Sequence, residues 1–86
     1  MGTYFLTVAL LLSQIEEGTV LSRVYIAGAT DAGAGRIQCS PPEVGTSDMM
    51  PDIIAALKLA PASSNAAVVV LKAVARKWPC VPQKDT

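Results

Sequence analysis

The two cysteines are the residues of this chain with the most distinctive chemistry. Cys39 stands in Arg36-Ile37-Gln38-Cys39-Ser40-Pro41-Pro42 and Cys80 in Lys77-Trp78-Pro79-Cys80, and the 86 residues contain no other cysteine. Both lie near prolines at the expected ends of helical segments: Cys80 directly follows Pro79, and Cys39 is two residues before Pro41. We expect a disulfide, which would stabilise so small a core by about 4 kcal/mol in the chain-entropy model and would indicate an oxidising compartment. Two buried free thiols, acting as small apolar residues, are the alternative.

Other residue types offer little catalytic or metal-binding chemistry. Histidine is absent, which removes the commonest general base and the commonest metal ligand together. Two cysteines alone make a poor zinc site, and there is no C-x-x-C motif. Asp48 and Asp52 fall on one face of an expected helix, but acidic residues in a first turn are also expected because they complement the helix dipole. We therefore predict no enzyme, no metal site and no cofactor.

The composition indicates one small globular domain over residues 1–86. The chain is 51% apolar and 16% charged, and seven Lys and Arg balance seven Asp and Glu. No basic stripe could neutralise phosphates, so nucleic acid is excluded as a partner.

Glycine and proline divide the chain into four segments, and the last two carry clear apolar stripes at helical spacing. We predict an all-α fold, a small four-helix bundle with one disulfide, in which the tail 81–86 frays. The helices are expected near residues 3–15, 19–34, 48–59 and 64–77. The run Tyr4–Leu12 is too short to span a bilayer and lacks a preceding Lys or Arg and a following small-residue cleavage site. It is interpreted as the first core helix of a mature protein, without membrane insertion.

The second segment is ambiguous by pattern. Its β-branched and aromatic residues favour a strand, which would form a hairpin with the first segment across residues 16–18. These residues are Val20, Val24, Tyr25 and Ile26. On a helix, the same segment would present a small-residue face that allows a neighbouring backbone to approach closely. That face comprises Gly28, Ala29, Ala32 and Gly33.

The first segment is apolar on every face of a helix, because Leu6, Leu10 and Leu11 supplement the main stripe. A helix of this kind is either fully buried or packed against another chain. Since so small a domain can cover little of it, we expect a homodimer that buries part of Tyr4–Leu12 or of the second helix.

The order of several motifs resembles a known family. Tyr25-Ile26-Ala27-Gly28-Ala29-Thr30-Asp31-Ala32 is followed by Cys39-Ser40-Pro41-Pro42, an amphipathic helix, and a last helix that closes on Trp78-Pro79-Cys80. This resembles the immunity proteins of type VI secretion amidase effectors, the resistance-associated immunity proteins, over about Tyr4 to Cys80. Many members have a further cysteine where this chain has Ser22 or Arg23, and a glycine where it has Val24.

The resemblance implies a small all-α protein that is exported to the periplasm. There it would bind and occlude a toxin that cleaves peptide bonds in peptidoglycan. The resemblance also favours a helix for the second segment. The alternative function is a small secreted helical module that only dimerises or serves as a scaffold.

The candidate residues divide into structural and partner-binding sets. We expect Tyr25, Gly28, Asp31, Trp78 and Pro79 to serve the fold, with Gly28 permitting tight helix packing. Loops project beyond a helix bundle, so they are the expected contacts for the effector. The candidate loop residues are Pro61, Ser63, Ser64 and Asn65 before the last helix, and Glu43 and Asp48 before the third.

Overall fold

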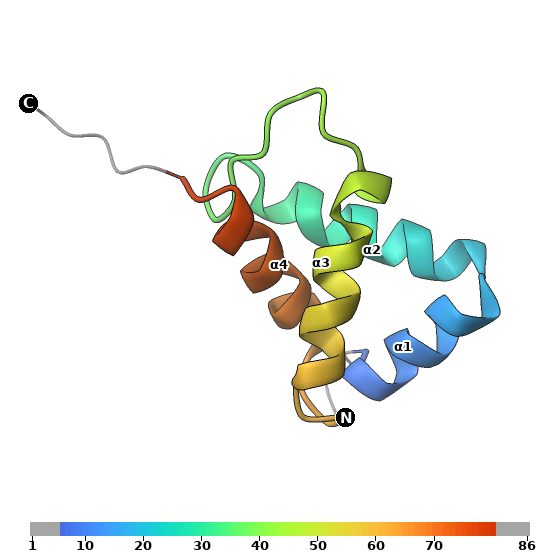
Figure 1. Cartoon of the computed structure of the whole chain (residues 1–86). Helices are drawn as coiled ribbons and strands as arrows, with labels where there is room; N and C mark the ends of the chain where they lie inside the picture. Colours follow the sequence, from blue (N-terminus) through green and yellow to red (C-terminus); the bar gives the residue numbers. More distant parts are fainter. Residues whose placement is uncertain (1–5, 81–86) are drawn as a thin grey trace, which may run out of the picture.

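The computed structural model describes residues 6–80, which fold as four α-helices around one core. Figure 1 shows α3 and α4 side by side, with α2 crossing behind them and α1 at the edge. The helices are α1 (Val8–Glu17), α2 (Val20–Gly33), α3 (Thr46–Leu59) and α4 (Ala66–Lys77). The all-α prediction with one disulfide is confirmed, and no strand forms within the described residues.

The hairpin alternative is excluded because α1 and α2 are both helical and meet at a tight corner. Gly18 adopts a left-handed φ of 69°, and its N–H and that of Thr19 donate to the carbonyls of Ile15 and Gln14. The Thr19 hydroxyl then accepts from the Ser22 N–H at 3.2 Å and caps α2. Residues 16–18 therefore end one helix rather than turn between strands, although α1 extends to Glu17 and not to residue 15.

Three predicted helix starts are wrong by about two residues or more. Leu6 and Thr7 precede α1, and the Thr7 hydroxyl accepts from the Leu10 N–H at 3.3 Å; residues 3–5 of the predicted helix lie outside the described residues. α4 begins at Ala66 because Asn65 caps it, its Oδ1 accepting from the Ala67 N–H.

α3 begins at Thr46, two residues before its predicted start. Asp48 is the third helical residue, and its carboxylate accepts from the Gly45 N–H at 2.9 Å. Because the helix starts earlier than expected, Pro51 lies inside α3.

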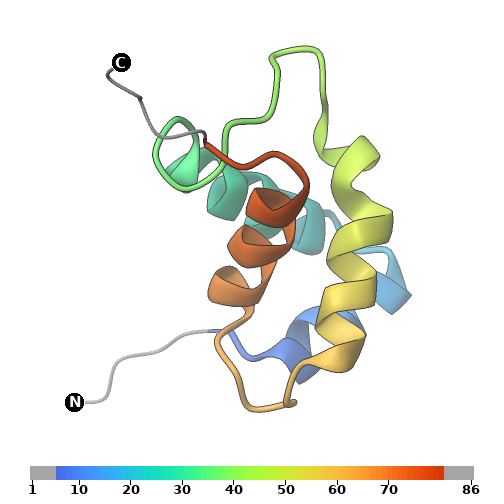
Figure 2. The same ribbon diagram turned by 60° about the vertical axis from the view of Figure 1, so that its left-hand side comes forward.

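The core is built from one stripe of each helix. α3 packs most extensively against α4, and α4 next against α2. Figure 2 shows α4 lying between α2 and α3. The buried cluster consists of Val8, Leu11, Ile26, Met49, Ile53, Leu57, Ala66, Val70 and Val74. None of the helices within residues 6–80 is long and apolar enough to cross a membrane.

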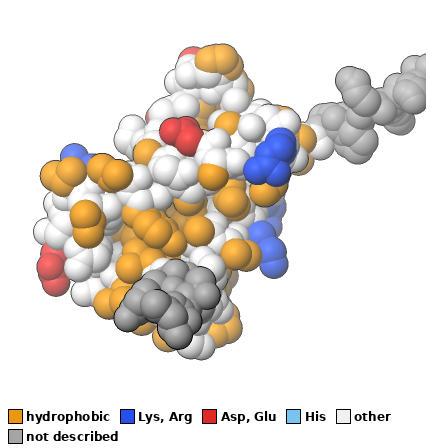
Figure 3. All heavy atoms as spheres, turned by 180° about the vertical axis from the view of Figure 1, so that it is seen from behind, with side chains coloured by type: hydrophobic (Ala, Val, Ile, Leu, Met, Phe, Trp, Pro, Cys, Tyr) orange, Lys and Arg blue, Asp and Glu red, His pale blue; other side chains and the backbone are white. Residues whose placement is uncertain are grey.

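Part of the apolar surface is left outside this core. Leu10 of α1 and three residues of α2, Val20, Leu21 and Val24, are between 52% and 71% exposed. We call these four residues the α1–α2 apolar face. Seen from behind, the molecule shows hydrophobic side chains gathered over this region (Figure 3). A cluster of exposed apolar side chains is typical of an interaction site.

Candidate functional site

The two candidate loops lie at opposite ends of the molecule. Figure 1 shows the α3–α4 connection beside the start of α1 and the α2–α3 connection at the far end of the bundle. The structure therefore does not bring Pro61, Ser63, Ser64 and Asn65 together with Glu43 and Asp48. A single partner groove of modest size would engage one set or the other.

The backbone of the α3–α4 loop forms hydrogen bonds with the first turn of α1. The N–H groups of Val8 and Ala9, in the first turn of α1, donate to the carbonyls of Ser64 and Ala62 at 2.9 and 3.1 Å. First-turn N–H groups have no partner within their own helix, so this loop satisfies them. Since Asn65 caps α4 as well, only Pro61 and Ser63 among the four candidates are exposed.

The α2–α3 loop, residues 40–45, is anchored at both ends but projects between them. Figures 1 and 2 show it as an arch beyond the helices. The Cys39 N–H donates to the Trp78 carbonyl at 2.8 Å, and the Val44 N–H donates to the Pro41 carbonyl at 3.0 Å. Val44 packs against the core while Pro42 and Glu43 are exposed. These contacts pre-organise the loop, which lowers the ordering cost of binding through it.

The predicted disulfide is present at the base of this loop. Cys39 and Cys80 are bridged, with their Cα atoms 4.9 Å apart across a sequence separation of 41. The bridge joins the segment after α2 to the segment after α4. It therefore fixes the start of the 40–45 loop to the end of the last helix.

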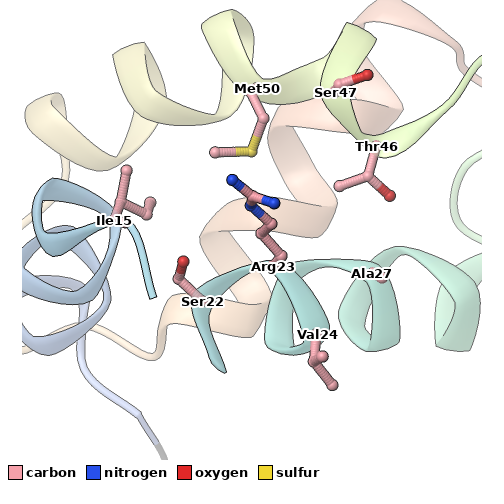
Figure 4. A pocket seen from close by; sticks show the side chains of 9 residues that line it. Ile15, Ser22, Arg23, Val24, Ala27, Thr46, Ser47 and Met50 are labelled. Atoms are coloured by element: carbon pink, nitrogen blue, oxygen red, sulfur yellow. The ribbon is translucent and has the colours of Figure 1, made fainter. Parts of the chain in front are cut away.

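An open groove of about 810 Å³ lies between the α1–α2 corner and the start of α3. Figure 4 shows the Arg23 side chain rising from α2 into this space, with Met50 of α3 facing it. The lining residues are Ile15, Gly18, Ser22, Arg23, Val24, Ala27, Thr46, Ser47 and Met50. Thr46 directly follows the 40–45 loop, so the groove and the loop form one continuous surface.

The carboxylates that could have acted as a catalytic pair have other partners. Asp48 accepts from the Gly45 N–H, and Asp52 pairs with Lys77 at 3.3 Å on the surface. No group of three or more metal-ligating side chains occurs within residues 6–80. Both carboxylates are therefore engaged in contacts within the fold.

Comparison with known families gives a match over residues 13–80, to the Rap1a immunity proteins. The chain belongs to this family. Its members are immunity proteins associated with type VI secretion effectors, so the suspected family is confirmed. A search of curated proteins and a search of solved structures found no match to this chain.

The motif residues of this immunity protein have unequal structural roles. Tyr25 and Trp78 are half-buried against the core, and α4 ends just before Trp78 and Pro79. Asp31 is exposed near the end of α2, where its carbonyl accepts from the Ala34 N–H. The expected packing role of Gly28 is wrong, because Gly28 is exposed and a Cβ added there would meet nothing within 4 Å.

Gly33 is the glycine of α2 against which neighbouring side chains pack too closely for a Cβ to fit without a shift. A Cβ added at Gly33 would lie 2.5 Å from Leu71 Cδ2 and 3.2 Å from Ile37 Cβ. The close packing expected of the small-residue face therefore occurs on α2, but at Gly33, the last residue of the helix, and not at Gly28. The approaching groups are the Leu71 side chain of α4 and the Ile37 side chain of the turn that follows α2.

Sequence reasoning missed Gln38, which links α2 to the loop. Gln38 is 3% exposed, its Nε2 donates to the Thr30 carbonyl at 3.0 Å, and its Oε1 accepts from the Ser40 N–H at 2.8 Å. A buried amide with both ends bonded fixes the geometry around it. The only sequence signal was its position beside Cys39. Arg23 was missed as well, because the groove exists only once α2 and α3 are packed.

Proposed function

We propose that this immunity protein binds and inhibits a secreted peptidoglycan amidase in the periplasm and so protects the cell that produces it. Family membership establishes an immunity protein associated with a secreted effector. The disulfide is consistent with an extracytoplasmic location, and the periplasm is where an enzyme that cleaves peptidoglycan would act. Inhibition of this kind requires tight binding and no catalytic group on the inhibitor.

The observation that carries the inhibitory role is the projecting 40–45 loop. It combines exposed Pro42 and Glu43 with anchoring by the disulfide, by the Pro41–Val44 turn and by the packing of Val44. A rigid protrusion can enter a hydrolytic groove at low entropic cost. Of the four candidates on the other loop, only Pro61 and Ser63 are exposed, and the Ser64 carbonyl and the Asn65 side chain hold α1 and α4.

A matched pair of loop variants tests this assignment. Glu43→Arg changes an exposed side chain on the projecting loop, whereas Ser63→Arg changes an exposed side chain on the opposite loop. We expect Glu43→Arg to weaken inhibition of the proposed partner, a secreted peptidoglycan amidase of the producing organism, by at least about tenfold, the loss of one modest interface contact. Ser63→Arg should leave inhibition unchanged. The reverse pattern would assign the inhibitory contact to the α3–α4 loop.

The proposal includes a homodimer that buries the α1–α2 apolar face. Leu21 and Val24 are 69% and 63% exposed, and Leu10 on the adjacent helix is 52% exposed. A shallow hollow between Leu10, Leu21 and Tyr25 would receive a side chain of the second copy. Tyr4 and Phe5, which were also expected to contribute, lie outside the described residues.

Sedimentation at tens of micromolar tests the dimer. The wild type should sediment as a dimer, and Leu21→Glu should sediment as a folded monomer because a carboxylate cannot be buried unpaired at an apolar interface. Monomeric wild-type protein at this concentration would contradict the dimer. A dimer that inhibits no peptidoglycan hydrolase would instead favour the second candidate function, a helical module whose role is dimerisation alone.

A further inference from the structure

The groove between α2 and α3 combines apolar walls with a single cation. Ile15, Ala27 and Met50 provide aliphatic surface, and Figure 4 shows the Arg23 guanidinium extending between α2 and α3 toward Met50. Its volume of about 810 Å³ lies in the range in which clefts bind ligands or inserted side chains.

Within residues 6–80, Arg23 has no carboxylate partner. The only ion pair in this part of the chain joins Lys77 to Asp52. The carboxylate of Asp48, in the first turn of α3, instead accepts from the Gly45 N–H at 2.9 Å. The groove therefore presents an unpaired positive charge, which favours an anionic group on the partner.

From this charge and these walls we propose that the groove receives an acidic segment of the effector. A carboxylate of that segment pairs with Arg23, and a neighbouring aliphatic side chain packs against Met50. The guanidinium can hold a carboxylate by two parallel hydrogen bonds. The inference rests on the proposed function and extends it by naming a second contact region, continuous with the 40–45 loop through Thr46.

The effector fits this groove better than a second copy of the chain does. Figure 4 shows Val24, which belongs to the α1–α2 apolar face, directed away from Arg23 on the other side of α2. A dimer formed through that face would leave the guanidinium accessible. Val24 also lines the groove, so the dimer face and the groove meet at this residue, while the guanidinium lies on the opposite side of α2 from the Val24 side chain.

The test measures affinity for the proposed partner, a secreted peptidoglycan amidase of the producing organism, using the full chain and calorimetry. Arg23→Gln removes the cation, and we expect a loss of about 30-fold or more, the effect of truncating one partner of an interfacial charge pair. Arg23→Glu should lose more. Lys72→Gln is the matched control, because Lys72 is an exposed cation on α4, which does not line the groove. It should bind as the wild type does.

Hydroxyl-radical footprinting locates the contact without a substitution. Met50 lines the groove and is partly exposed, whereas Met49 beside it is 4% exposed and serves as an internal reference. We expect the effector to protect Met50 from oxidation and to leave the low reactivity of Met49 unchanged. Unprotected Met50, in a complex that inhibits the amidase, would overturn the groove proposal.

The outcomes separate the groove from the proposed function. If the wild type binds and inhibits the amidase while Arg23→Gln and Arg23→Glu do so equally well, the groove proposal fails alone. If the wild type binds no peptidoglycan amidase, both fail. If Arg23→Glu dissociates a wild-type dimer in sedimentation, the groove belongs to a second copy and the effector assignment is wrong.

Discussion

Removal of the disulfide should destabilise this protein by an amount that follows from its position. The Cys39–Cys80 bridge closes a loop with a sequence separation of 41 that contains all of α3 and α4. In the chain-entropy model, a loop of this length restricts the unfolded state by about 4 kcal/mol at 25 °C. That is a large share of the 5–15 kcal/mol that is typical of folded domains. We expect the Cys39→Ala/Cys80→Ala protein to be only marginally folded.

Urea unfolding followed by helical circular dichroism measures this difference. Small domains lose roughly 1 kcal/mol of stability per molar urea or somewhat more. The unfolding midpoint of the double variant should therefore fall by up to about 4 M, or no folded baseline should remain. Wild-type protein under reducing conditions is the matched control, because it loses the bridge and keeps both sulfur atoms.

The two forms should agree closely, since Cys39 is exposed and Cys80 only half-buried, so that little packing is lost with the thiols. A loss of less than about 1 kcal/mol in both forms would refute the reasoning. It would mean that residual structure already restricts the unfolded chain when the bridge is absent.

Two further substitution pairs test the backbone assignments by the same unfolding measurement. Gly28→Ala should stabilise the protein by about 0.5–1 kcal/mol, because the helix gains a better former in open space. Gly33→Ala should not increase the stability, since its Cβ would meet Leu71. Equal changes in stability at Gly28 and Gly33 would contradict the packing described. Asn65→Ala should cost about 1 kcal/mol through loss of the α4 cap, while Ser63→Ala should be neutral. Equal losses at these two positions would show that the cap contributes nothing.

The sequence predicted the architecture well where local signals and packing agree. The stripe of α4 and the stop at Trp78 and Pro79 place that helix correctly at its C-terminal end. The disulfide was predicted because both cysteines follow helical segments beside prolines. The β-propensity of Val20 and Val24 was misleading for α2, because these residues lie on an exposed helix face instead of in a sheet.

Helix starts were less predictable because several residues could cap each one. Thr7, Gly45 and Asn65 precede the three misplaced helices, and the choice among neighbouring polar residues depends on tertiary contacts. The start of α1, for example, is fixed by carbonyls of the α3–α4 loop, more than fifty residues away along the chain. No local pattern contains that information.

The candidate site was predictable only in part for the same reason. The sequence correctly placed Glu43, Pro61 and Ser63 in exposed loops, but it gave no sign that the two loops lie at opposite ends of the bundle. Nor did it show that Ser64 and Asn65 are used by the fold. The groove around Arg23 forms between elements that are distant in sequence, so it becomes visible only in three dimensions.

The most direct test of the central claim is a titration of the proposed partner, a secreted peptidoglycan amidase of the producing organism, with the purified, disulfide-bonded immunity protein. The readout is the release of muropeptides from isolated peptidoglycan. The proposed function predicts that hydrolysis falls linearly to zero as the immunity protein reaches the concentration of amidase sites. Full hydrolysis in the presence of excess folded immunity protein would contradict it.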